Sequence, residues 1–303
     1  SVFKYAAILV MVSVGSWMFV HHKMQSIDLK LTEDLFLKNA SQNPTLFLGD
    51  GSKHAISGNN AELDFSMSGQ IEANGESISS AQSGGSKPDV LVVPFGKKAR
   101  VKLSDGTRIC VNAGSRIIFP DRFTQKKREI YLVGEAYFEV AHDPDKPFLV
   151  KTSTVTIRVL GTSFNVSSYP DDEFVSTVLK EGKIRMEEND SQLFESSVDL
   201  IPNQMAVFKK DGNGIRVVKT DPENYILWTD GILKFEKQEI NQLITKVERF
   251  YNISIELKNP QIGKERITGK LDLNAGILEV FESISQLSHA KIKKISAVEY
   301  ILE

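Results

Sequence analysis

Apolar and polar residues alternate one by one in nearly every segment between residues 90 and 220, and strand-like sequence begins at Thr45. This alternation is typical of half-buried β-strands, in which successive side chains point to opposite faces. Short strands at close spacing predict an antiparallel β-sandwich or a solenoid-like β fold. The apolar positions expected to face its core are Val101, Leu103, Ile109, Val111, Ile117, Phe119, Tyr131, Val133, Phe138, Val140, Val155, Ile157 and Val159.

Asp-Gly pairs stand between several of these alternating runs. The run LFLGDGSKHAI (Leu46 to Ile56) echoes VKLSDGTRICV (Val101 to Val111), and each centres on one such pair. Asp-Gly between apolar alternation predicts a hairpin, because the tight turn requires positive φ. The pairs are Asp50-Gly51, Asp105-Gly106 and Asp211-Gly212. A further glycine, Gly182, is expected at a bulge or turn.

After Trp228 the spacing of apolar residues changes to that of alternating strands and helices. Two amphipathic helices are predicted, the second capped by Asn274. Their core faces are Ile240, Leu243, Ile244, Val247, Phe250 and Tyr251, and then Ile277, Phe281, Ile284 and Leu287. The order β-α-β, β-α-β with an added edge strand predicts a small α+β module. Asn259-Pro260 is expected to turn, and Glu299 to Glu303 is expected beside a free sheet edge.

An uncharged run, Tyr5 to Val20, opens the chain between Lys4 and His21. It is slightly shorter than the roughly 20 residues of a membrane helix, but its flanks can extend it. A signal peptide would end in small residues, whereas bulky residues follow here. The predicted organisation is a transmembrane helix in 1–23, a juxtamembrane segment in 24–44, first hairpins and a Ser/Gly-rich linker in 45–89, a β domain in 90–225 and the α+β module in 226–303.

The amino-acid composition limits which class of protein this chain can belong to. The 303 residues are 41% hydrophobic and 25% charged, as in globular proteins, and the net charge of -2 disfavours a nucleic-acid binder. The single cysteine, Cys110, cannot form an internal disulfide, and its apolar neighbours predict a buried thiol. We expect no cofactor and no metal, because the sequence holds no phosphate-binding loop, no dinucleotide fingerprint, no nucleophile elbow and no zinc pattern.

One group of residues resembles a catalytic cluster: Glu135, Glu139, His142, Asp143 and Asp145. Glu135 and Glu139 would lie about 13 Å apart along one strand, too far for a glycosidase pair. Asp143-Pro-Asp145 is typical of a turn, so a solvated loop is expected. The basic run Gln125 to Arg128 is interpreted as a hairpin tip.

Three phrases in this region together resemble one family. LSDGTRICVN (Leu103 to Asn112), GEAYFEV (Gly134 to Val140) and VLGTSFNV (Val159 to Val166) closely resemble the periplasmic domain of FecR-type anti-sigma factors. The sequence FEKQEINQLITKVERFYNISIEL and the later GKLDLNAGILEVFESISQL resemble the carboxy-terminal domain commonly fused to it, which is similar in layout to the short secretin and TonB-receptor signalling domain. Cys110 departs from the family pattern, which more often has an aromatic residue there.

The resemblance implies a non-enzymatic, single-pass protein of the inner membrane with its bulk in the periplasm. It would relay a signal from the signalling domain of an outer-membrane TonB-dependent transporter to a cytoplasmic ECF-type sigma factor. The sigma-binding domain would precede Ser1 and is expected to be missing from this chain. An anchored periplasmic glycan-binding β-sandwich is the alternative, but it needs clustered exposed aromatics, and Trp17 and Trp228 are far apart. A hydrolase ranks below both.

The resemblance also marks Gly161-Thr162, because some FecR-type proteins cleave themselves at the equivalent Gly-Thr. The Thr162 hydroxyl would attack the Gly161 carbonyl and give an ester that water opens. In the alternative interpretation, Gly161 permits a tight bend and Thr162 bonds to nearby backbone. The same residues fit both.

Overall fold

The computed structural model describes residues 42–67, 70–79, 87–189, 197–211 and 214–303. The predicted span and nearly all of the juxtamembrane segment lie outside these ranges. Among the helices that are described, none has the length and apolar content needed to cross a bilayer.

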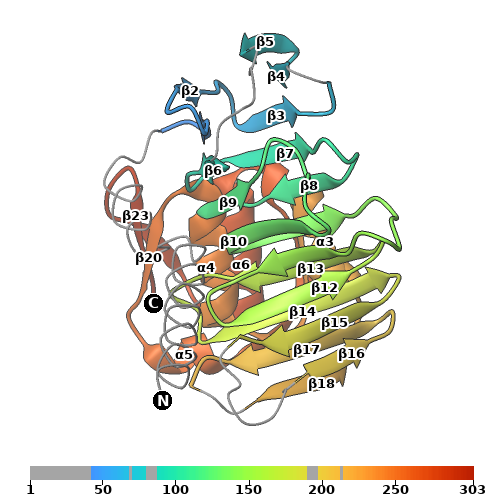
Figure 1. Cartoon of the computed structure of the whole chain (residues 1–303). Coiled ribbons are helices and arrows are strands. Elements are labelled where there is room, and N and C mark those ends of the chain that lie inside the picture. Colours follow the sequence, from blue (N-terminus) through green and yellow to red (C-terminus); the bar gives the residue numbers. More distant parts are fainter. Residues whose placement is uncertain (1–41, 68–69, 80–86, 190–196, 212–213) are drawn as a thin grey trace, which may run out of the picture. The chain divides into compact units, whose positions relative to one another are not determined.

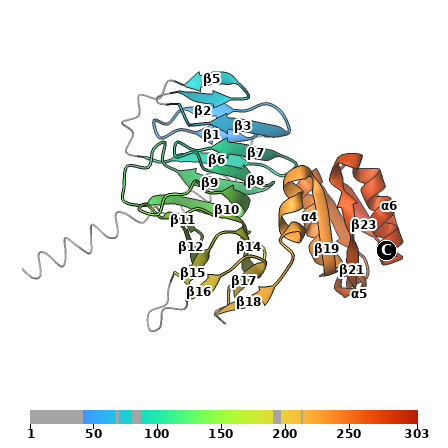
Figure 2. The same cartoon turned by 90° about the vertical axis from the view of Figure 1, so that its right-hand side faces the viewer.

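Two β-sheets face each other in the β domain and share one strand (Figures 1 and 2). The first sheet runs in the order β2 (Lys53–Ala55), β1 (Thr45–Phe47), β6 (Asp89–Val93), β9 (Ser115–Phe119), β10 (Arg128–Glu139), β11 (Phe148–Lys151), β12 (Val155–Val159), β15 (Ile184–Glu188) and β16 (Ser197–Leu200). The second runs β5 (Glu76–Ser79), β4 (Ile71–Ala73), β3 (Asn60–Asp64), β7 (Lys98–Lys102), β8 (Arg108–Val111), β10, β13 (Ser163–Ser168), β14 (Phe174–Glu181), β17 (Gln204–Lys209) and β18 (Ile215–Lys219).

Strand β10 joins the two sheets because it bends at Gly134. Its first half pairs with β9 and β11, and its second half pairs with β8 and β13. Gly134 has φ of +98°, and a Cβ atom there would lie 2.3 Å from the Ser115 hydroxyl oxygen. Both the backbone angle and the close approach therefore require glycine at the bend.

Most of the predicted core positions are confirmed. Val101, Ile109, Ile117 and Phe138 are among the buried residues of one apolar cluster between the sheets. In the first half of β10 the prediction was wrong by one residue, since Ile130 and Leu132 are buried and Tyr131 and Val133 are half-buried. This half of β10 is apolar on both faces, so alternation alone does not select the core face.

The pairing is mixed, whereas the sequence predicted an antiparallel arrangement. Strands β3 and β7 are parallel, and so are β10 and β11. The cause is the crossing between sheets: β10 ends in the second sheet, and residues 140–147 lead the chain back to the first sheet, where β11 lies beside the start of β10. Other crossings between the sheets, such as that from β12 to β13, give antiparallel neighbours.

The two described Asp-Gly hairpins have the same hydrogen bonds. Gly51 N donates to Leu48 O and Gly106 N donates to Leu103 O, both at 2.9 Å. The aspartate of each turn accepts from the backbone N–H two residues later, and both glycines have positive φ. The predicted turn geometry is thus confirmed. Asp211 ends the described part of its hairpin, because Gly212 lies outside it, although β17 and β18 pair as a hairpin should.

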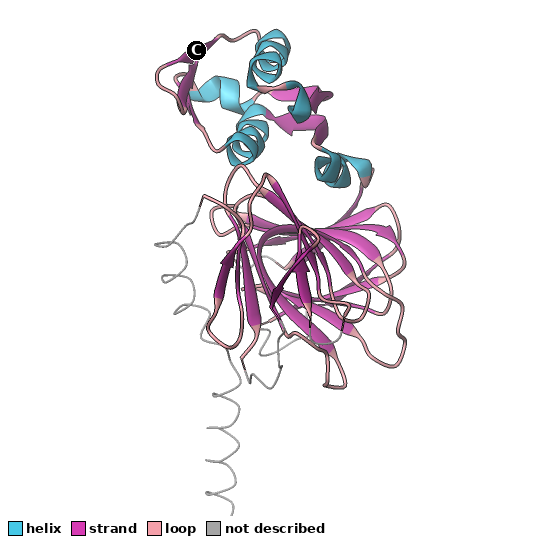
Figure 3. Cartoon of the chain, turned by 90° about the horizontal axis from the view of Figure 1, so that it is seen from above, coloured by secondary structure: helices cyan, strands magenta, loops and turns pink. Residues whose placement is uncertain are grey.

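All of the helices that the structure describes belong to the carboxy-terminal module (Figure 3). Its elements are α3 (Glu223–Ile226), the 3₁₀ turn η1 (Leu227–Asp230), β19 (Ile232–Glu239), α4 (Ile240–Tyr251), β20 (Ser254–Leu257), α5 (Pro260–Lys264), β21 (Arg266–Asp272), η2 (Leu273–Ala275), α6 (Ile277–Ser288), β22 (Ile292–Lys294) and β23 (Glu299–Leu302). Helices α4 and α6 turn most of the predicted apolar residues toward a core of their own, with Phe250, Tyr251, Ile277 and Leu287 at its margin.

Three details of this module differ from the prediction. The strands form two separate sheets, β19–β21 and β20–β23–β22, so the Glu299 to Leu302 strand is central and no free edge lies along it. Asn259 accepts a hydrogen bond from Gln261 N and caps α5, with Pro260 at the first helical position, where a missing N–H costs nothing. Asn274 does not cap α6, because its amide donates to Asp230 O and Gly276 precedes the helix.

Candidate functional site

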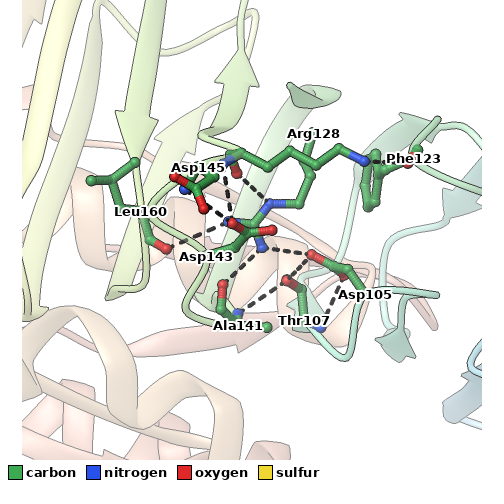
Figure 4. Close-up of polar contacts among 9 residues, drawn as sticks. Asp105, Thr107, Phe123, Arg128, Ala141, Asp143, Asp145 and Leu160 are labelled. Carbon is green, nitrogen blue, oxygen red and sulfur yellow. Dashed lines mark hydrogen bonds and ion pairs between the residues drawn. The ribbon is translucent and has the colours of Figure 1, made fainter. Parts of the chain in front are cut away.

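Arg128 connects the first and third sequence motifs with the segment that follows the second (Figure 4). It starts β10, and its side chain is only 2% exposed. Its guanidinium donates to Asp105 Oδ2 at 2.8 Å, to Ala141 O at 2.7 Å and to Lys146 O at 2.8 Å, with a longer contact of 3.4 Å to Leu160 O. The interpretation of residues 125–128 as a hairpin tip is therefore wrong for Arg128, whose buried side chain bonds to other segments of the chain.

The four acceptors of Arg128 belong to three segments of the chain. Asp105 lies in the first motif and also accepts hydrogen bonds from the backbone and hydroxyl of Thr107. Ala141 and Lys146 bracket the return from β10 to β11, and Leu160 lies in the third motif. One charged group thus ties the β7–β8 hairpin, the crossover and the β12–β13 turn together.

The candidate cleavage dipeptide, Gly161-Thr162, lies directly beside this connection, in the β12–β13 turn. Thr162 is 5% exposed, and its hydroxyl donates to Lys183 O at 3.0 Å. A Cβ atom at Gly161 would lie 2.5 Å from His142 Nδ1, so the imidazole packs against this glycine. A Cβ atom at Gly182 would lie 2.7 Å from Thr162 Oγ1 and 2.9 Å from Gly161 O, and Gly182 has φ of +96°.

This geometry bears on both interpretations of the dipeptide. The Thr162 hydroxyl bonds to backbone in the described conformation, as the structural interpretation expects. His142, which the sequence placed in a solvated loop, is exposed but lies against Gly161. Spacing in the sequence could not show this neighbour, because the crossover and the turn are brought together only by the fold.

Glu135 is the meeting point of the three motifs. Its carboxylate accepts a hydrogen bond from the Asn112 amide at 2.8 Å and from the Asn165 amide at 2.9 Å, and its own backbone N–H donates to Ser115. Asn112, Glu135 and Asn165 each come from a different motif. The polar residues of the three motifs therefore form one hydrogen-bonded group.

The remaining members of the acidic group do not converge on a reaction centre. Glu139 pairs with Arg108 at 3.5 Å, and Asp143 accepts hydrogen bonds from Asp145 N and Lys146 N in a turn. No set of His, Cys, Asp and Glu suited to a metal ion occurs among the residues that the structure describes.

Cys110 is half-buried rather than buried. Its neighbours Ile109 and Val111 face the core between the sheets, so Cys110 faces outward and packs against the apolar cluster of the carboxy-terminal module. Burial raises the pKa of its thiol to about 11, so the reactive thiolate is scarce near neutral pH.

A pocket of about 540 Å³ lies on the outer face of the second sheet, next to Thr229 and Asp230. Its charged side chains pair across neighbouring strands, as in Lys102 with Asp64 at 3.1 Å. Such pairing is typical of a solvated sheet face.

Comparison with known proteins shows which family has this architecture. Residues 89–185 match the model of the family described as FecR protein, and residues 232–302 match the model described as FecR, C-terminal. The chain belongs to the FecR family. The first match covers the strands that carry all three motifs, and the second covers the carboxy-terminal module from β19 to β23.

Solved structures agree with this membership. The chain is similar to a candidate anti-sigma factor from Parabacteroides distasonis ATCC 8503, solved at 1.65 Å, with 30% identity and a TM-score of 0.64 over 71% of this chain and 98% of that one. A second structure of such a protein from the same organism, at 2.50 Å, is 30% identical with a TM-score of 0.63 over 70% and 97%. No curated protein matches the chain.

Proposed function

We propose that this FecR-family chain is the membrane-anchored and periplasmic part of an anti-sigma factor. Membership of the family and the likeness to the Parabacteroides protein support an anti-sigma-factor-like function and a sigma factor as partner. The observation that carries the proposal is the presence of both FecR regions in one chain, in order, each folded around its own apolar core.

In the proposed relay, the carboxy-terminal module receives the signal from a TonB-dependent transporter's signalling domain. Exposed apolar side chains support a partner surface there: Leu278 is 76% exposed on α6, and Ile295 and Val298 flank the β22–β23 turn. Isolated exposed apolar residues are common on protein surfaces, so a matched variant is needed to test their role.

Calorimetry with the transporter's signalling domain tests this assignment. We expect deletion of Gly231 to Glu303 to abolish binding, and Leu278→Asp to weaken it at least tenfold. Ile201→Asp is the control, because Ile201 is 59% exposed but lies between β16 and β17 of the β domain. Undiminished binding after the deletion would place the receiving surface on the β domain.

We further propose that Tyr5 to Val20 spans the inner membrane and that residues 42–303 lie in the periplasm. The uncharged run supports this topology. A phosphatase fused after Glu303 should then be active only in exported form. Activity of a cytosolic reporter at the same position would contradict the topology.

Apart from self-cleavage, we propose that the protein is not an enzyme. In the self-cleavage step, Thr162 Oγ would bond to the Gly161 carbonyl carbon, the Gly161–Thr162 C–N bond would break, and the amine would take the hydroxyl proton. Water would then hydrolyse the ester. The buried Thr162 and the adjacent His142 support the proposal, whereas the bond from Thr162 to Lys183 O must first be released.

The glycan-binding alternative finds no support in Trp228. This side chain is 6% exposed, and its indole N–H donates to Asn165 Oδ1 at 3.1 Å. A tryptophan held in this way is not available to stack on a sugar ring.

A further inference from the structure

The β domain and the carboxy-terminal module each have their own apolar core. One cluster of buried residues fills the space between the two sheets, and a second lies within the module. Of the described β-domain residues, only Tyr137 and the half-buried Cys110 belong to the second cluster. Apolar contact between the two parts is therefore small, and polar groups must carry much of their attachment.

The first polar attachment is made by Arg249 in the last turn of α4. Its guanidinium pairs with both carboxylate oxygens of Asp172, at 2.6 and 3.2 Å, and lies 3.6 Å from the centre of the Tyr169 ring. The Arg249 carbonyl also accepts the Gly96 N–H at 2.9 Å. The side chains of Arg249 and Asp172 are 13% and 34% exposed, so water competes only partly with the pair.

The second polar attachment is made through Trp228 of η1. The indole N–H bonds to Asn165, whose amide bonds to Glu135, so the module is connected to the group that the three motifs form. Lys98 of β7 donates to the carbonyls of Trp228 and Thr229, both at 3.3 Å.

Lys246 of α4 adds a charge at the same junction. Burial lowers the pKa of its ammonium group, while the charges of Glu135 and Asp172 act in the opposite direction. The motif residue Glu135 therefore interacts both with amides of its own domain and with a cation of the module.

We propose that these contacts form a latch, defined as Arg249–Asp172, Trp228–Asn165 and Lys98 with the η1 carbonyls, which can open while both parts stay folded. A largely polar junction between two separately packed cores can dissociate while exposing few residues of either core, here Trp228 and Tyr137 of the second cluster. Opening would uncover Glu135, Asn165 and Trp228 together. Any partner that binds the open form more tightly would shift the equilibrium toward it. The latch does not depend on the proposed relay.

The test uses the full chain with Trp17→Phe, which leaves Trp228 as the remaining one of the two tryptophans. In this background Arg249→Met removes the charge and keeps an apolar stem against Tyr169. Arg185→Met is the matched control, because Arg185 also makes a two-bond pair, with Asp199 at 2.9 and 3.2 Å, but this pair joins β15 to β16.

We expect Arg249→Met to shift Trp228 emission to the red and to speed hydrogen exchange of the Gly96 N–H at least tenfold, which corresponds to about 1.4 kcal/mol. Exchange in β13, β14 and α6 should keep its protection, and Arg185→Met should change neither signal. Asp172→Asn combined with Arg249→Met should add little to the single variants, because both remove the same contact.

Two results would overturn the proposal. If protection in β13, β14 and α6 falls together with that of Gly96, the junction belongs to a single cooperative unit. If Arg249→Met behaves like Arg185→Met, the Arg249 contacts do not hold the two parts together.

Discussion

Replacing Arg128 by methionine should destabilise the β domain more than any substitution of a surface charge. The variant removes the donors to Asp105, Ala141 and Lys146 and leaves the Asp105 carboxylate without its cation. Hydrogen bonds to charged groups contribute roughly 1.5–3 kcal/mol each, and they are not additive. Loss of one partner from a buried pair costs about 3–5 kcal/mol. We expect the loss to stay within that range, because Asp105 keeps its hydrogen bonds from Thr107 and is not left without any partner.

Urea unfolding followed by the change in midpoint measures this loss. Arg185→Met is again the control, since Arg185 and Asp199 are 52% and 68% exposed and an exposed pair contributes about 0–1 kcal/mol. Arg128→Lys should recover part of the stability, because it restores the charge but not the forked donor geometry. A loss below about 1 kcal/mol for Arg128→Met would show that Arg128 does not hold the motifs together.

Three further predictions follow from the same contacts. If Gly161-Thr162 cleaves itself, the unsubstituted protein should give two associated fragments whose summed mass exceeds that of the intact chain by one water, and Thr162→Ala should run as one band. If the unsubstituted chain stays intact after long incubation, the dipeptide is only a structural turn. Burial raises the pKa of Asp89 to about 6 from an ordinary 3.8, so its contribution to stability is present below pH 3.8 and is lost as the pH rises through 6; Asp89→Asn should therefore raise the unfolding free energy at pH 7.5 by at most about 3 kcal/mol, with little change at pH 4. Gly134→Ala should lower the unfolding midpoint strongly, because the new methyl group would lie 2.3 Å from the Ser115 hydroxyl at a φ of +98°, whereas Gly75→Ala, with φ of +80° and open space around it, should cost only the backbone strain.

The local sequence pattern predicted the positions of strands and turns better than it predicted which strands pair. Val155, Ile157 and Val159 are buried as alternation requires, and the two described Asp-Gly turns form as their φ preference demands. Pairing depends on where the chain crosses between sheets, and no local pattern encodes the parallel neighbours of β10 and β3.

The candidate site was only partly predictable for a similar reason. The motifs marked Gly161 and Thr162, but Arg128 appeared as one of several consecutive basic residues, and only the fold distinguishes it from exposed Lys126 and Lys127. Asn112 follows β8, where a polar residue carries no special signal, and Asn165 is a buried polar residue within β13 whose partners the sequence does not show. Their common partner, Glu135, becomes apparent only when three separate strands are placed side by side.

The central claim, an anti-sigma factor that relays a transporter signal, is tested most directly by transcription from a promoter of its sigma factor. We expect a gene for an ECF-type sigma factor beside the gene for this chain, and its product is the sigma factor to use. We predict that deleting the gene changes reporter output and removes its response to the transporter's ligand, and that a gene lacking codons for Gly231 to Glu303 restores sigma control but not the response. An unchanged response in the deletion strain would contradict the account.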